Sequence, residues 1–189
     1  MSGPLPKEAP VLPPLPESVN ETFKILENNP VVKDALKQIK EEEQLTMADQ
    51  IALTEIEAPP FHEEVRAAYF ADRLRELGLT NVRIDKEGNV IGTRPGKGNG
   101  PRLVLGAHLD TVFPAGTNVK VRQEGTKYYA PGISDDARGL AVVLEVLRTL
   151  QKFNIQTEGD LLFIGSVGEE GNGDLRGGKY LFSSKEEHI

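Results

Sequence analysis

The 189-residue chain contains no cysteine and no tryptophan, and only 6% of its residues are aromatic. The absence of cysteine excludes disulfides, thiol nucleophiles and any zinc site that is built on thiolate ligands. The sequence also lacks an apolar run of membrane-spanning length, and its start lacks the basic and apolar segments of a secretory signal peptide. These absences predict a protein with no membrane partner in a reducing, cytoplasmic setting.

Basic residues are in the minority, since 22 Lys and Arg stand against 29 Asp and Glu, for a formal net charge of −7. No block of basic residues interrupts this balance, which argues against nucleic acid as a partner. Hydrophobic residues make up 38% of the chain, enough for a packed core, and the length is that of about one domain.

The sequence divides into a proline-rich arm, predicted for residues 1–18, and a folded part over residues 19–189. Proline fixes φ and donates no backbone hydrogen bond, so the arm is expected to be extended. The folded part alternates two patterns, which predicts an α/β fold in layers. Helices are predicted near 20–40, 47–57, 63–77, 136–150 and 175–182, and strands at 82–84, 90–91, 103–107, 119–122, 127–129 and 161–167.

Two predictions within these elements concern what is buried. The strands 103–107 and 161–167 are continuous apolar runs, which are typical of strands covered on both faces of a parallel sheet. The helix 63–77 is expected to bury an apolar stripe and to end at Gly78. That stripe consists of Val65, Ala68, Tyr69, Leu74 and Leu77, and the first helix is expected to bury Val32, Leu36 and Ile39.

Three short segments concentrate groups that bind metals or move protons, at 108–110, 132–136 and 168–171. The first and third directly follow the two apolar strands, and the second directly precedes the helix 136–150. Ligands of α/β sheets bind beyond the carboxyl ends of the strands. We therefore expect the three segments to meet at one edge of the sheet.

The residue types in these segments form a set of nitrogen and oxygen ligands suited to zinc, manganese or cobalt. Asp110 lies two residues after His108, where a carboxylate can orient the imidazole. Glu169 and Glu170 diverge as neighbours, so one can bind a metal while the other acts as a base. Taken singly, His108 with Asp110 could be a surface pair, Asp135 with Asp136 could be a helix cap, and Glu169 with Glu170 could be a solvated turn. The other histidines, His62 and His188, are predicted to be solvated.

The motifs GAHLDTV (106–112), YYAPGISDDARGLA (128–141) and GSVGEEGNGDLRG (165–177) resemble those of a family of zinc metallopeptidases and amidohydrolases. This family contains peptidase T, acetylornithine deacetylase, succinyl-diaminopimelate desuccinylase, aminoacylase and carnosinase. The motifs are most similar in sequence to those of peptidase T-like members. The resemblance covers about residues 49–182. It implies the first part of an aminopeptidase-like catalytic domain with three layers, αβα, around a mixed, mostly parallel sheet.

The resemblance also implies a dinuclear zinc site, with cobalt or manganese as alternatives, that hydrolyses an amide bond in a small peptide or N-acyl amino acid. The implied roles are terminal metal ligands for His108 and Glu170, the bridging ligand for Asp135, orientation of the imidazole for Asp110, and general base for Glu169. The peptide bond between Asp135 and Asp136 is expected to be cis.

Family members carry a further acidic ligand, a later histidine and a second domain for dimerisation and closure over substrate. No counterpart of these precedes Ile189, so the resemblance implies an N-terminal portion with little activity of its own, from a protein that could form a homodimer. The alternative is a non-catalytic binding or assembly module that retains part of the fold. The intact His-x-Asp, Asp-Asp and Glu-Glu pairs favour the enzyme.

Overall fold

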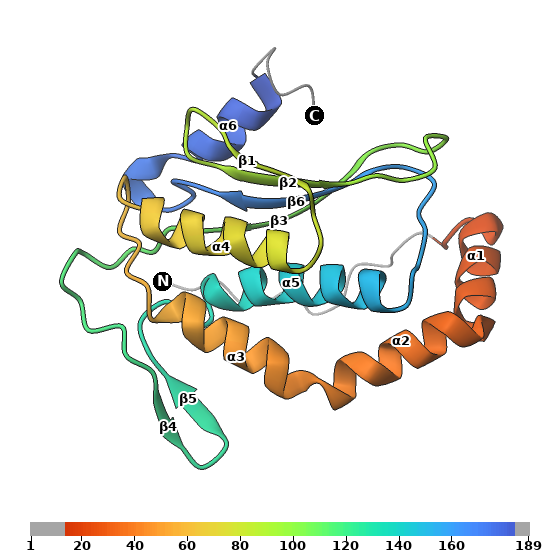
Figure 1. The fold of residues 1–189 in the computed structure, drawn as a ribbon, viewed down its shortest axis with the longest axis horizontal. Helices are drawn as coiled ribbons and strands as arrows, with labels where there is room; N and C mark the ends of the chain where they lie inside the picture. The colour runs from red at the N-terminus through yellow and green to blue at the C-terminus, as the bar shows by residue number, and fades with distance from the viewer. Residues whose placement is uncertain (1–13, 184–189) are drawn as a thin grey trace, which may run out of the picture.

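A four-stranded mixed sheet lies at the centre of the fold, in the order β1-β2-β6-β3, and helices cover it (Figure 1). The structure is a computed structural model that describes residues 14–183. The strands are β1 (Asn81–Ile84), β2 (Val90–Arg94), β3 (Leu103–His108), β4 (Arg122–Glu124), β5 (Lys127–Tyr129) and β6 (Leu161–Ser166). The helices are α1 (Glu17–Asn28), α2 (Pro30–Glu41), α3 (Glu43–Thr54), α4 (Glu64–Glu76), α5 (Ala137–Lys152) and α6 (Arg176–Ser183), with a 3₁₀ turn at Gly171–Gly173.

The sheet combines parallel and antiparallel pairing, which confirms the predicted α/β fold with a mixed sheet. β3 runs parallel to β6, whereas β2 is antiparallel to both β1 and β6. The expectation of a mostly parallel sheet is therefore wrong for the described strands. One of the two antiparallel pairs follows from the tight turn between β1 and β2, where the Asp85 carboxylate accepts the N–H groups of Glu87, Gly88 and Asn89. A turn this short can join only antiparallel strands.

The two apolar strands differ in how they are covered. β6 lies between β2 and β3 and is buried over all residues but its last, as predicted. β3 has one neighbour in the described sheet and is partly open, with Leu103 54% exposed. The prediction that 103–107 is buried on both faces is wrong, because the apolar run does not reveal how many strands flank it.

Helices cover both faces of the sheet and form the three layers that the resemblance implied. α4 and α5 lie on one face, with α3 packed outside α5, and α6 lies on the other face (Figure 1). Phe70, Leu140 and Phe163 belong to the larger apolar cluster beneath α4 and α5. Leu181 of α6 packs with Ile91, Leu162 and Ile164 on the opposite face. The β4–β5 hairpin projects away from these layers. Its second strand lies where predicted, whereas β4 begins at Arg122, the last residue of the strand predicted at 119–122.

The buried face of α4 differs by one position from the predicted stripe. Val65 is 68% exposed and Ala68 is also exposed. The helix instead buries Arg66, Ala67, Phe70, Ala71 and Leu74. The shift follows from Arg66, whose fully buried guanidinium finds backbone carbonyl acceptors inside the protein. Hydropathy counts such a residue as a surface residue. Gly78 ends the helix with a φ of +97°, as expected of a glycine cap.

Two helices replace the single one predicted near 20–40. Pro30 begins α2, and Asn29 accepts backbone N–H bonds at the start of that helix, so the chain breaks between α1 and α2. Leu36 is 62% exposed, contrary to expectation, and Ala35 is buried instead. Most of the predicted arm lies outside the described residues, and α1 begins within its last residues, at Glu17. No helix in residues 14–183 is long and apolar enough to cross a membrane.

Candidate metal centre

The three polar segments meet at one edge of the sheet, as predicted from their position in the sequence. His108 is the last residue of β3 and lies opposite Ser166, the last residue of the parallel strand β6. The chain continues from β6 into Glu169 and Glu170, and Asp135 lies just before α5. The carboxyl ends of two parallel strands and the start of one helix thus frame the site.

Three side chains at this edge can hold a metal ion together. One ligand atom from each of His108, Asp135 and Glu170 lies within 4.8 Å of the others. The Nε2 atom of His108 lies 2.8 Å from Asp135 Oδ1. The Asp135 side chain is 71% exposed, so it can adjust to a cation that enters from solvent. One imidazole and two carboxylates form a donor set that fits zinc, cobalt or manganese.

His108 is held by its other ring nitrogen. Its Nδ1 lies 3.0 Å from the backbone carbonyl oxygen of Asp110 and 3.6 Å from the Asp110 carboxylate. A metal-binding histidine commonly donates its second N–H to such an oxygen, which fixes the ring. Burial alone would lower the pKa of His108, but the carboxylates of Asp110 and Asp135 outweigh it and raise the pKa to about 9.

Asp110 is fully buried. It follows β3 and binds the backbone of the residues that follow β6. Its two carboxylate oxygens accept the backbone N–H groups of Glu169 and Glu170, each at 2.9 Å. Burial alone would raise the pKa of Asp110, but hydrogen bonds from His108 and from these two N–H groups hold it below its usual range. The sequence pointed to a contact with His108, and the structure adds a second contact, to the Glu169–Glu170 turn.

The two adjacent aspartates before α5 separate into different environments. Asp136 caps the helix through an N–H bond from Gly139 at 2.9 Å and also accepts the backbone N–H of His108 at 3.2 Å. Burial raises the pKa of Asp136. The peptide bond between Asp135 and Asp136 is cis, as the resemblance implied. The helix-cap interpretation therefore holds for Asp136, while Asp135 faces His108.

The two adjacent glutamates also diverge. Glu170 belongs to the cluster of three, and burial together with the neighbouring charge of Asp135 raises its pKa. Glu169 lies beside that cluster, with its carboxylate 4.0 Å from His108 Nε2 and its side chain 44% exposed. A pocket of about 410 Å³ begins at Glu170. Its other lining residues are Pro60, Phe61, Val112, Gly171 and Asn172.

The family described as Peptidase family M20/M25/M40 matches residues 104–188, a stretch that includes all three polar segments. Residues 104–188 are therefore similar to this family. The chain is 36% identical over 104 residues to carboxypeptidase G2 of Pseudomonas sp. (strain RS-16), covering 51% of this chain and 25% of that protein. It is 33% identical over 135 residues to succinyl-diaminopimelate desuccinylase of Corynebacterium glutamicum, covering 69% of this chain and 36% of that protein.

A solved structure agrees with these sequence matches. The crystal structure of a tripeptidase from Staphylococcus aureus superposes with a TM-score of 0.58 and 26% identity, over 70% of this chain and 40% of that chain. The predicted family and its aminopeptidase-like fold are thereby confirmed. The matched part of this chain spans between a quarter and two fifths of the length of these three relatives.

Sequence reasoning missed the buried residues that hold the backbone around the site. Arg66 donates from Nη1 to the Leu109 carbonyl oxygen at 2.7 Å and from Nε to the Ile56 carbonyl oxygen at 3.0 Å. Burial lowers the pKa of Arg66 to about 10, and the charge of Asp110 opposes the shift. Glu63 and Arg176 contact Gly168, the residue before Glu169 and Glu170. Glu63 and Arg66 lie outside the three motifs, so no local pattern could have revealed them, whereas Arg176 lies within the motif 165–177 but its contact with Glu63 is not visible in the sequence.

Of the other histidines, His62 is exposed, as predicted. His188 lies outside the described residues.

Proposed function

We propose that this chain forms part of a metal-dependent hydrolase that cleaves an amide bond in a small peptide or N-acyl amino acid. The observation that carries the proposal is the group of His108, Asp135 and Glu170, whose ligand atoms lie within 4.8 Å of one another. Two zinc ions are the proposed cofactor, with cobalt or manganese as alternatives. His108 and Glu170 would be the terminal ligands of one ion each, and Asp135 would bridge the two.

When bound, the ions would polarise the amide carbonyl and favour the attack of water. The residues of this chain provide the rest of the chemistry. Glu169, beside the cluster but outside it, would take a proton from the attacking water and deliver it to the leaving amine nitrogen. Asp110 would keep His108 and the Glu169–Glu170 turn in place through the contacts described above.

The proposed substrate class rests on the relatives and on the pocket beside Glu170. The names of the relatives refer to a carboxypeptidase, a desuccinylase and a tripeptidase. The pocket presents apolar surface from Pro60, Phe61 and Val112 next to a proposed metal ligand. An apolar part of a peptide or acyl group would lie against this wall. A second function without catalysis has no observation in its favour.

The described residues contribute three ligand groups, and zinc sites usually take three or more protein ligands for each ion. We therefore propose that the active form of the enzyme adds ligands from outside this chain, and that the 189-residue chain alone binds metal weakly and hydrolyses little. Dimerisation through an additional domain and the cytoplasmic setting stay predictions.

Hydrolysis assays on the purified 189-residue chain test this proposal. With zinc or cobalt added, we expect turnover of dipeptides and N-acyl amino acids to stay far below that of the full-length relatives. A chelator should abolish the remaining turnover. If the chain alone bound metal in stoichiometric amount and hydrolysed substrate at the rate of the relatives, the proposed need for ligands from outside the chain would be wrong. Turnover that survives removal of all metal would contradict the metal-dependent mechanism.

A further inference from the structure

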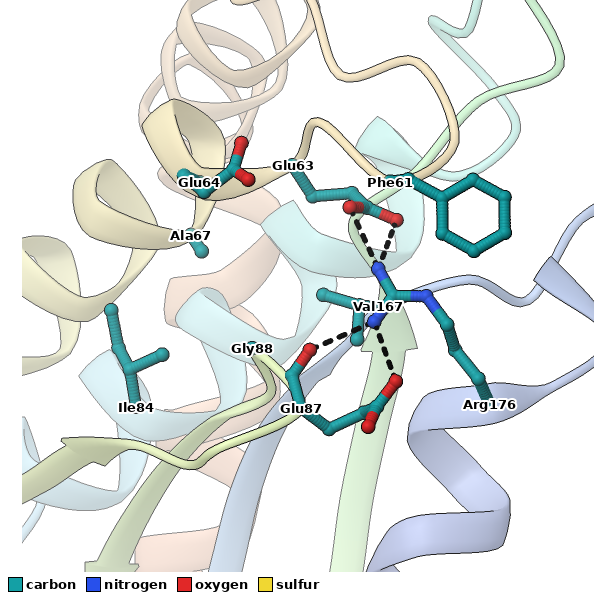
Figure 2. Close-up of a pocket in the computed structure, with 9 residues that line it drawn as sticks. All are labelled: Phe61, Glu63, Glu64, Ala67, Ile84, Glu87, Gly88, Val167 and Arg176. Carbon is teal, nitrogen blue, oxygen red and sulfur yellow. Dashed lines mark hydrogen bonds and ion pairs between the residues drawn. The ribbon is translucent and has the colours of Figure 1, made fainter.

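A partly buried cluster of charges contacts Gly168, the residue before Glu169 and Glu170. Figure 2 shows the Arg176 guanidinium between two carboxylates, with Glu63 on one side and Glu87 on the other. Glu63 is the residue before α4, Glu87 lies in the turn between β1 and β2, and Arg176 is the first residue of α6. Three segments that are distant in sequence therefore converge on one guanidinium.

The contacts of Arg176 are numerous and well defined. Its Nη2 donates to both carboxylate oxygens of Glu63, at 2.9 and 2.8 Å, and its Nη1 donates to the Glu87 backbone carbonyl at 2.8 Å and carboxylate at 2.9 Å. The guanidinium carbon lies 5.2 Å from the centre of the Phe61 ring, a cation–π contact. Paired, charge-assisted bonds of this kind fix orientation as well as distance.

The cluster is bonded to the backbone of the turn itself. Glu63, which is 3% exposed, accepts the N–H of Gly168 at 3.2 Å through Oε1. Gly168 has a φ of +61°, and a Cβ on it would lie 2.6 Å from the Arg176 side chain. The Arg176 backbone N–H donates to the Gly168 carbonyl oxygen at 3.3 Å. The chain thus needs a glycine here to bring the turn against the guanidinium.

The turn is therefore held from two sides. Asp110 accepts the N–H groups of Glu169 and Glu170, while Glu63 accepts the N–H of Gly168. Beside the guanidinium lies a pocket of about 330 Å³, lined also by Ala67, Ile84 and Val167 (Figure 2).

We infer that Glu63 and Arg176 are positioning residues, which hold the Gly168–Glu170 turn so that Glu169 and Glu170 reach the metal centre. The inference rests on the proposed function, because that function assigns Glu169 and Glu170 of this turn to the metal centre. Neither residue belongs to the ligand group, so both act through the backbone of Gly168. Their loss should loosen the turn and weaken metal binding even where the rest of the domain stays folded.

A matched control is available in the same chain. Arg148, near the end of α5, forms ion pairs with the buried carboxylates of Asp49 and Glu145. Its side chain is 14% exposed, compared with 20% for Arg176. Arg148 lies twelve residues beyond the Asp136 cap, about 18 Å along the helix. Replacing either arginine by methionine should destabilise the fold, but only Arg176 contacts the turn.

The test compares Arg176→Met with Arg148→Met in the 189-residue chain. The two readouts are hydrogen exchange of the Glu169 and Glu170 amides without metal, and cobalt affinity from a titration of visible absorption. For Arg176→Met we expect exchange at these amides to rise by roughly tenfold or more, and cobalt affinity to fall by about 10–100-fold. For Arg148→Met we expect neither change, and Arg176→Lys should recover part of the amide protection.

Unchanged exchange at Glu169 and Glu170 in Arg176→Met, or equal effects of the two methionine variants, would overturn the inference. If Arg176→Met fails to fold, Glu63→Gln, which keeps the shape of the side chain but removes its charge, is measured in the same way. If the wild-type chain binds no cobalt, the proposal that this chain alone binds metal weakly is wrong, whereas the exchange of the turn amides without metal still decides whether Glu63 and Arg176 position the turn.

Discussion

Replacement of Glu169 by glutamine is expected to slow amide hydrolysis by the active form by about 10²–10⁴-fold, the usual contribution of a positioned general base. Glutamine keeps the size of the side chain and the N–H bond to Asp110 but cannot accept a proton from water. Because Glu169 lies outside the group of three ligands, cobalt affinity should stay nearly unchanged. The measurements are kcat on the active form and a cobalt titration of the 189-residue chain.

The neighbouring variant Glu170→Gln is the matched control. It makes the same chemical change one residue later, but at a side chain of the ligand group. Here cobalt affinity should fall, and hydrolysis should recover in part when more metal is added. If Glu169→Gln retained full activity, or if the two variants behaved alike, the assignment of Glu169 as the base would be wrong.

The second large effect is expected for Asp110→Asn, which should weaken cobalt binding by about 10–100-fold, as loss of a ligand's hydrogen-bond partner typically does. The wild-type carboxylate accepts two N–H groups of the Glu169–Glu170 turn, one with each oxygen. An asparagine offers one acceptor oxygen and turns an NH₂ group toward the other N–H. The turn would shift, and Glu170 would move away from His108.

Asp160→Asn provides the control for this variant. Asp160 also accepts a backbone N–H bond with its carboxylate, from Gly96 at 2.9 Å, but it lies just before the opposite end of β6. The cobalt titration should separate the two variants, with Asp160→Asn close to wild type. Equal cobalt affinity in Asp110→Asn and wild type would show that the buried carboxylate does not support the centre.

The place of the site could be predicted because it depends on local patterns. His108 and Glu169 follow apolar strands, and parallel strands bring their carboxyl ends to one edge of a sheet. The histidine and the carboxylates in the sequence motifs then indicated a metal site at that edge. Asp136 could not be separated from Asp135 in this way, since only the three-dimensional placement shows which of them caps α5 and which faces His108.

The supporting residues depend on contacts between distant parts of the chain. Glu63 meets Arg176 across 113 positions, and Arg66 meets Leu109 across 43. Neither pairing leaves a periodic pattern in the sequence. For the same reason the buried face of α4 was misassigned, because a fully buried arginine is recognised only once its carbonyl acceptors are known. The open edge of β3 likewise depends on the order of strands, which the strand's own residues do not encode.

A cobalt titration of His108→Ala, compared with wild type and His62→Ala, tests the metal centre most directly. His108 supplies the nitrogen ligand of the group, whereas His62 is an exposed histidine outside it. The proposed centre predicts that wild type and His62→Ala bind cobalt alike, and that His108→Ala loses affinity by more than the roughly 10–100-fold expected for a ligand's hydrogen-bond partner. Equal cobalt affinity in all three proteins would contradict a metal centre at this edge of the sheet.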